Sequence, residues 1–219
     1  MSIKRIFSIT VFSLLFIAII YAILIFQNDI KYALGMMDKF PKDADNISPG
    51  LTSLFKGLDP KLTEGMTFVS FYSYNFRSWY GDESIGGYSP YFHSIEIQII
   101  NDENSYPYRV YHELGHSVWY NVLNQTERDI WKEIYSKSNY FVTDYAKTSY
   151  YEDFAETFAK YMTRGYDKET CYSNCGIDYN RLCVLNSFFR RINNETQDGN
   201  YKCDIGSYSC DSSVCYHKL

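Results

Sequence analysis

The sequence predicts an α+β fold, in which a small, mostly antiparallel sheet precedes a long central helix and a mainly helical C-terminal lobe. Residues 66–74 are rich in β-formers, and residues 93–100 alternate apolar and polar residues before becoming fully apolar, so both are expected to be strands. In the middle of the chain, apolar residues recur at helical spacing, as in Tyr111, Leu114 and Val118. This periodicity predicts an amphipathic helix with one apolar face.

Capping residues and glycines indicate where the loop and the helices around the sheet begin and end. Residues 81–90 carry three glycines and are expected to form a loop between the two strands. Helices are expected at residues 105–123, 126–138, 150–163 and 178–192. Thr126 can cap the second of them, and Gly165 follows the end of the third. Residues 140–146 are expected to be irregular or extended.

Length and composition allow one ordinary domain with attached segments. The chain has 219 residues, within the range of about 50–250 residues that single domains occupy, plus attachments. Hydrophobic residues make up 46% and aromatic residues 19%, which is enough for a packed core. The net charge is −5 and no cluster of Lys and Arg occurs, which excludes nucleic acid as the main partner.

The N-terminal segment predicts a membrane anchor. Residues 6–26 form a run of 21 residues without charge, Pro or Gly, and about 20 apolar residues span a bilayer. Lys4 and Arg5 precede this run, so the positive-inside rule places residues 1–5 in the cytoplasm and the rest outside the cell. The alternative is a cleaved signal peptide and a secreted protein. That reading expects an apolar region of only about 7–15 residues and a small-residue cleavage site, which is absent after Phe26.

The rest of the chain divides into three parts. Residues 27–50 have mixed charges and turn-forming residues and predict a stalk, and residues 51–168 predict the globular domain. Residues 169–219 contain all six cysteines. An even number of cysteines in an exported chain predicts up to three disulfides, whose pairing is open. A structural zinc site is the alternative for these cysteines, although their spacing does not match paired zinc knuckles.

The central helix contains the segment HELGH, formed by His112, Glu113, Leu114, Gly115 and His116. Histidines four residues apart project from one helix face, so two imidazoles can occupy two corners of a zinc tetrahedron. The glutamate lies about 100° around the helix axis, from where it reaches a water on the metal without chelating the metal itself. The alternative is that both histidines are ordinary surface or core residues.

The helix at residues 150–163 offers the third protein ligand that a catalytic zinc takes beside water. Glu152 and Glu156 share one face of this helix, opposite the apolar stripe of Phe154 and Phe158. One carboxylate can bind zinc while the other orients a zinc-bound histidine through its second ring nitrogen. The alternative is that both glutamates form the solvated face of an amphipathic helix.

These two segments carry a resemblance to known zinc metalloproteases. HELGH followed 36 residues later by EDFAETFA resembles the catalytic domain of anthrax lethal factor and is similar to the secreted Pro-Pro endopeptidases of Gram-positive bacteria. The resemblance implies a zincin-like fold with Zn²⁺ held by His112, His116 and Glu152, and with Glu156 in a supporting role. It also implies a catalytic tyrosine seven residues before the ligand glutamate, which falls on Tyr145.

The resemblance, which covers about residues 60–165, implies an endopeptidase acting on a peptide or protein substrate. A zinc-bound water, activated by Glu113, is expected to attack a peptide carbonyl, with Tyr145 stabilising the oxyanion. Residues 93–100 are expected to be an edge strand that aligns an extended peptide. The alternatives are a catalytically inactive, membrane-displayed binding protein, a ligand built on the Cys-rich tail, and a zinc hydrolase of a non-peptide bond.

Overall fold

The computed structural model describes residues 3–25, 27, 31, 38–72, 86–99, 105–164, 177–194, 208–211 and 214–217. The α-helices in these ranges are α1 (Ile3–Ile25), α3 (Leu51–Gly57), α4 (Tyr106–Asn121), α5 (Gln125–Lys137), α6 (Tyr150–Arg164) and α8 (Tyr179–Ile192). Two short 3-10 helices are η1 (Ala44–Asn46) and η3 (Tyr145–Thr148). The strands are β1 (Val69–Tyr72), β2 (Gly86–Ser89), β3 (Ser94–Gln98), β4 (Tyr208–Asp211) and β5 (Val214–His217). The predicted α+β class is confirmed.

The main sheet is mixed, whereas a mostly antiparallel sheet was expected. Its strand order is β1-β3-β2: β1 runs parallel to β3 and β2 runs antiparallel to it. The strand predicted at residues 93–100 is β3, and the prediction that it lies at an edge is wrong, because it is paired on both sides. Its side chains explain the central position, since Ile95 and Ile97 are both fully buried.

β2 forms the edge of this sheet beside α4, within the segment 81–90 that was expected to be a loop. Among the described residues it pairs with β3 alone. The outer side of β1 is different, because the Val69 amide donates to the Lys39 carbonyl at 2.9 Å. Within the part of the chain that the structure describes, β2 is therefore an edge strand, the kind of strand that can bind another extended chain.

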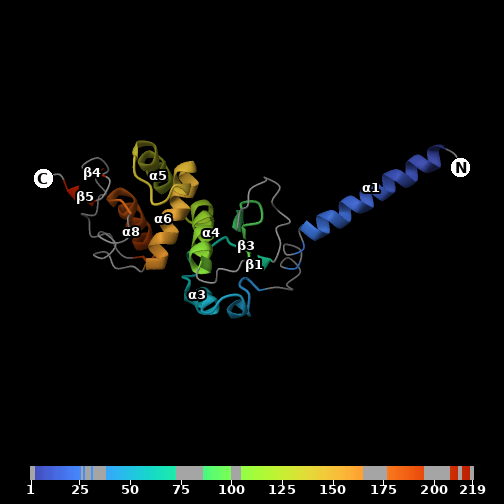
Figure 1. Ribbon diagram of the computed structural model, residues 1–219, viewed down its shortest axis with the longest axis horizontal. Helices are drawn as coiled ribbons and strands as arrows, with labels where there is room; N and C mark the ends of the chain where they lie inside the picture. The colour runs from blue at the N-terminus through green and yellow to red at the C-terminus, as the bar shows by residue number, and fades with distance from the viewer. Residues whose placement is uncertain are drawn as a thin grey trace.

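α4, the helix with the HELGH segment, lies between the sheet and the helices α5, α6 and α8 (Figure 1). It buries Val110, Leu114 and Val118 in the core; Leu114 and Val118 were predicted, whereas Tyr111 is only partly buried and Val110 takes its place. From the other side, α6 contributes Phe154 and Phe158, both with no exposed surface. The central position of α4 holds its histidine face against α6.

Gly115, the glycine of the HELGH segment, allows α4 and α6 to approach closely. A Cβ atom at this position would lie 2.9 Å from the Cα atom of Ala155, closer than such atoms come in real proteins. Ala155 belongs to α6, three residues after Glu152. The close approach of the two backbones therefore sets the distance between the histidines of one helix and the glutamates of the other.

The start of α5 is capped by Asn124, whereas Thr126 was expected to cap it. The Glu127 amide donates to Asn124 Oδ1 at 2.9 Å, and the Asn124 amide donates to Glu127 Oε2 at 2.8 Å, which makes a capping box. Arg191, at the end of α8, donates to both carboxylate oxygens of Glu127 at 2.7 and 2.8 Å. These contacts fix α8 against α5 on the side of α6 away from the sheet.

The C-terminal part of the predicted stalk packs on the domain. In residues 38–50, Ala44 is fully buried and Ser48 is 4% exposed. The ring of Phe40 stacks on Phe55 of α3 with centroids 5.1 Å apart. These residues therefore form part of the folded body, because their side chains complete the core under α3.

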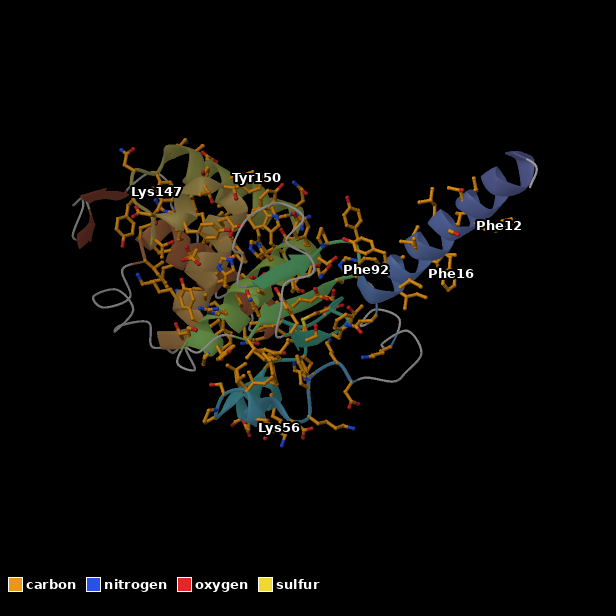
Figure 2. The ribbon with its side chains drawn as sticks, turned by 45° about the vertical axis from the view of Figure 1, so that its right-hand side comes forward. Phe12, Phe16, Lys56, Phe92, Lys147 and Tyr150 are labelled. Atoms are coloured by element: carbon orange, nitrogen blue, oxygen red, sulfur yellow. The ribbon has the colours of Figure 1, made fainter. Side chains whose placement is uncertain are left out.

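α1 extends away from the other elements, and its side chains at residues 10–23 are exposed, with Phe12 and Phe16 projecting outward (Figures 1 and 2). By hydropathy, none of the described helices is both long and apolar enough to cross a bilayer. The membrane anchor at residues 6–26 stays a prediction of the sequence. In the C-terminal region, Cys183 is buried on α8 and disulfide-bonded.

Candidate metal centre

Three ligand-type atoms converge between α4 and α6. His112 Nε2 and His116 Nε2 lie 3.2 Å apart, and Glu152 Oε2 lies 3.2 Å from the first and 3.3 Å from the second. A tetrahedral zinc with bonds of about 2.0–2.1 Å separates its ligand atoms by about 3.3–3.4 Å. The spacing of the three atoms therefore fits one triangular face of a zinc tetrahedron.

The charges of these groups favour a cation between them. Burial alone would lower the pKa of His112, but hydrogen bonds with the carboxylates of Glu152 and Glu156 raise it to about 10. Burial alone would raise the pKa of Glu152, but His112 and His116 lower it to about 2. Without a metal, a proton on an imidazole supplies the positive charge. A divalent cation at the same place would accept a lone pair from each of the three atoms.

Glu156 contacts His112 from the other side of the imidazole ring. Its Oε1 atom lies 2.7 Å from His112 Nδ1, and its side chain is 9% exposed. When zinc displaces the proton of Nε2, a proton kept on Nδ1 by this carboxylate leaves the Nε2 lone pair directed toward His116 and Glu152. The two glutamates thus differ in position: Glu152 faces both Nε2 atoms, whereas Glu156 reaches only Nδ1.

Glu113 lies beside this cluster as a buried carboxylate with an unused oxygen. It is 7% exposed, and its Oε2 atom accepts no hydrogen bond from the residues that the structure describes. Burial raises its pKa above the ordinary value. β2 begins directly over it, because a Cβ atom at Gly86 would lie 2.8 Å from Glu113 Oε1. Such a carboxylate is a strong proton acceptor next to the candidate metal position.

Tyr145 is brought to the same cluster by η3, the 3-10 helix that it begins. Its ring centroid lies 6.0 Å from that of His112, and the side chain is 55% exposed. Burial of the hydroxyl, together with the charges of Glu152 and Glu113, raises its pKa to about 12. The phenol is therefore neutral at physiological pH and can donate a hydrogen bond to an oxyanion.

Two further residues belong to the site and were not predicted from the sequence. Tyr108 donates its hydroxyl to Glu156 Oε2 at 2.8 Å, and Thr143 donates to the same atom at 2.7 Å. Tyr108 precedes His112 by one helical turn, which places it on the histidine face of α4, but the sequence does not indicate which residue its hydroxyl contacts. Thr143 lies in an irregular segment, where nothing in the sequence distinguishes it from the other polar residues nearby.

Comparison with protein-family models, with curated proteins and with solved structures finds no match to this chain. Within the ranges that the structure describes, His112, His116 and Glu152 are the one group of histidines, cysteines and acids placed to hold a metal ion. What the site can do chemically therefore follows from this cluster and from the groups around it.

Proposed function

We propose that this protein is a zinc-dependent endopeptidase with a zincin-like catalytic domain, displayed outside the cell on an N-terminal membrane anchor. One observation carries the proposal: the Nε2 atoms of His112 and His116 and Oε2 of Glu152 lie 3.2–3.3 Å from one another. A buried carboxylate, Glu113, adjoins them, and its Oε2 atom accepts no hydrogen bond from the described residues. This combination supports a hydrolytic zinc site more strongly than a structural one, because structural zinc sites are closed by four protein ligands.

Each residue has a separate task in the proposed reaction. Zinc, when bound, supplies a Lewis acid that polarises a carbonyl and lowers the pKa of water to about 7. Glu113 accepts the proton of the attacking water and passes it to the leaving amine. Tyr145 donates its hydroxyl hydrogen to the oxygen on which negative charge develops. Glu156 holds His112 in the tautomer whose Nε2 atom is free.

The edge position of β2 among the described strands supports an extended peptide as the substrate. Main-chain amide and carbonyl groups of such an edge align a peptide by β-augmentation, independently of its side chains. Gly86 places this edge next to Glu113, the proposed base. A peptide paired with β2 would therefore present its backbone carbonyls to the metal centre, which is the role that the sequence had assigned to residues 93–100.

The proposal is tested with the full chain, purified in detergent, by measuring zinc content and cleavage of a mixed peptide library by mass spectrometry. We expect about one zinc per chain and peptide cleavage. The Glu113→Gln variant should keep its zinc but lose cleavage by at least about 100-fold, since general base catalysis contributes that much. Glu133→Gln, on the exposed face of α5, is the matched control and should behave as the wild type.

Two results contradict the proposal in different ways. Zinc without cleavage of any peptide would favour a metal-containing binding protein. A chain without zinc, or cleavage that survives in Glu113→Gln, would exclude the site itself as the source of the activity.

A further inference from the structure

We propose that Tyr108 and Thr143 are positioning residues of the metal centre, which hold Glu156 so that it orients His112. We further propose that Thr143 ties the turn carrying Tyr145 to the same carboxylate. The inference rests on the proposed function, because it assigns work to residues around the same zinc site. Neither residue faces the metal position directly, so both act through Glu156.

The contacts of Glu156 use both of its oxygens. Oε1 lies 2.7 Å from His112 Nδ1. Oε2 accepts from the Tyr108 hydroxyl at 2.8 Å and from the Thr143 hydroxyl at 2.7 Å. A nearly buried carboxylate with this set of donors has one favourable orientation, because any rotation leaves a charged oxygen unpaired. The orientation of the carboxylate then fixes that of the imidazole.

The donors come from different elements, which makes Glu156 a junction between them. Tyr108 lies on α4, one turn before His112. Thr143 lies in the segment that leads into η3, and Glu156 lies on α6 with the ligand Glu152. The two hydrogen bonds and the ion-pair contact with His112 therefore join the elements that carry the histidines, the tyrosine and the glutamate ligand of the site.

Thr143 has a second contact that Tyr108 lacks. Its hydroxyl oxygen accepts a hydrogen bond from the Ala146 amide at 3.1 Å, while its hydrogen is donated to Glu156. Ala146 is fully buried and directly follows Tyr145 in η3. Loss of the Thr143 hydroxyl would thus free both the carboxylate that orients His112 and the turn that presents the Tyr145 phenol.

The first experiment measures zinc affinity of the full chain by competition with a chromogenic chelator. Thr143→Val and Tyr108→Phe should each weaken zinc binding by about 10-fold, the lower end of the effect of losing an outer-shell partner, because Glu156 itself stays in place. Thr143→Ser keeps the hydroxyl and should bind zinc within about threefold of the wild type. Thermal unfolding of the zinc-free proteins confirms that each variant is folded.

Two matched control variants remove a threonine hydroxyl and a tyrosine hydroxyl at positions that do not contact Glu156. Thr163→Val lies on α6, where the Thr163 hydroxyl contacts only backbone carbonyls of its own helix. Tyr111→Phe removes a phenol hydroxyl from α4 three residues after Tyr108. Both controls should retain the zinc affinity of the wild type, because neither hydroxyl reaches Glu156.

The second experiment separates the support of Glu156 from the positioning of the Tyr145 turn. It uses double-mutant cycles with Tyr145→Phe, in which kcat is measured. Thr143→Val and Tyr145→Phe should be non-additive, because the Tyr145 phenol is already displaced when the Thr143 hydroxyl is lost. Tyr108→Phe and Tyr145→Phe should be additive, because Tyr108 touches Glu156 and no part of η3. Purely structural roles would give the same pattern for both pairs.

The inference is overturned if Thr143→Val and Tyr108→Phe bind zinc as tightly as the wild type, or if Thr143→Ser binds as weakly as Thr143→Val. A wild-type chain that binds zinc but cleaves no peptide contradicts the proposed function alone, and the affinity measurements then still decide the role of Glu156 and its partners. A wild-type chain that binds no zinc contradicts both.

Discussion

Two buried charge clusters lie around α6, and neighbouring residues of the helix belong to different clusters. Glu152 faces α4, where its carboxylate meets two histidines. Asp153 faces α8, where both of its oxygens accept from Arg181 Nε at 3.0 and 2.9 Å and one also accepts from Trp131 Nε1 at 2.9 Å. Arg181 is fully buried and also pairs with Asp178.

The two clusters differ in the group that supplies their positive charge. The cluster around Arg181 contains its own permanent cation, because a guanidinium stays charged under all ordinary conditions. In the metal centre, the ion pairs that Glu152 and Glu156 form among the described residues are with histidines only. The charge of a histidine depends on a proton. A permanent pair serves to hold α6 and α8 together, whereas a cluster that lacks a fixed cation can accept and release a metal.

The largest effect is expected from Arg181→Met, which removes the permanent cation and makes the two clusters alike. Asp153 and Asp178 would then be buried charges without a positive partner, which costs about 3–5 kcal/mol of unfolding free energy. Urea unfolding of the zinc-free chain measures this. Lys137→Met, which breaks an ion pair of 70% and 52% exposed side chains, should change stability by less than about 1 kcal/mol. An equal effect of both variants would contradict the distinction.

Gly115→Ala should damage the metal centre more than the Arg181 cluster. The new Cβ atom would collide with the backbone of Ala155 at 2.9 Å, so α4 and α6 must separate. We expect a loss of about 1–3 kcal/mol of stability, as for other overpacked sites, together with weaker zinc binding. Gly57→Ala has open space around its Cβ atom and serves as the control, with unchanged or slightly higher stability. Unchanged zinc affinity in Gly115→Ala would show that helix contact does not set the ligand spacing.

Gly86→Ala should lower kcat without changing zinc content or stability. Its Cβ atom would displace only the end of the flexible Glu113 side chain. A misplacement of about 1 Å in a catalytic group costs about 10- to 100-fold in rate. Because the effect passes through Glu113, Gly86→Ala should cause no further loss in a Glu113→Gln background. A further loss there would mean that Gly86 acts on the substrate instead.

Per pH unit, the smallest effect is a dependence of zinc affinity on pH. In the zinc-free protein the pKa of His112 is raised to about 10, so zinc must displace a proton between pH 7 and 9. Affinity should rise by about tenfold per pH unit in this window and level off above pH 10. Glu152 contributes nothing to this slope, since its pKa is lowered to about 2. Chelator-buffered titrations measure the slope, and a flat profile would contradict it.

The helices and the candidate ligands could be predicted from the sequence because the patterns that indicate them are local. The spacing of His112 and His116 places both on one face of any helix, and the apolar periodicity around Leu114 predicts such a helix. The zinc-free geometry then separates the glutamates, with Glu152 at the Nε2 atoms and Glu156 at Nδ1. The sequence alone had left that choice to family resemblance.

The sheet order and the partners of Glu156 could not be predicted from the sequence, because they depend on contacts between residues far apart in the chain. β2 begins with two glycines and has no alternation, and its strand conformation comes only from pairing with β3. Thr143 and Tyr108 lie 13 and 48 residues before Glu156, and no local pattern links them. Thr126 and Asn124 are both good caps, and the capping box with Glu127 decides between them.

The most direct test of the metal centre is X-ray absorption at the zinc edge, recorded on the zinc-loaded full chain. The account predicts four nitrogen or oxygen neighbours at about 2.0–2.1 Å, with the outer-shell signals of two imidazoles and no sulfur. The Glu152→Gln variant should lose this signal together with most of its zinc. Sulfur neighbours at about 2.3 Å would place the zinc on the cysteines of residues 169–219 instead and would contradict the account.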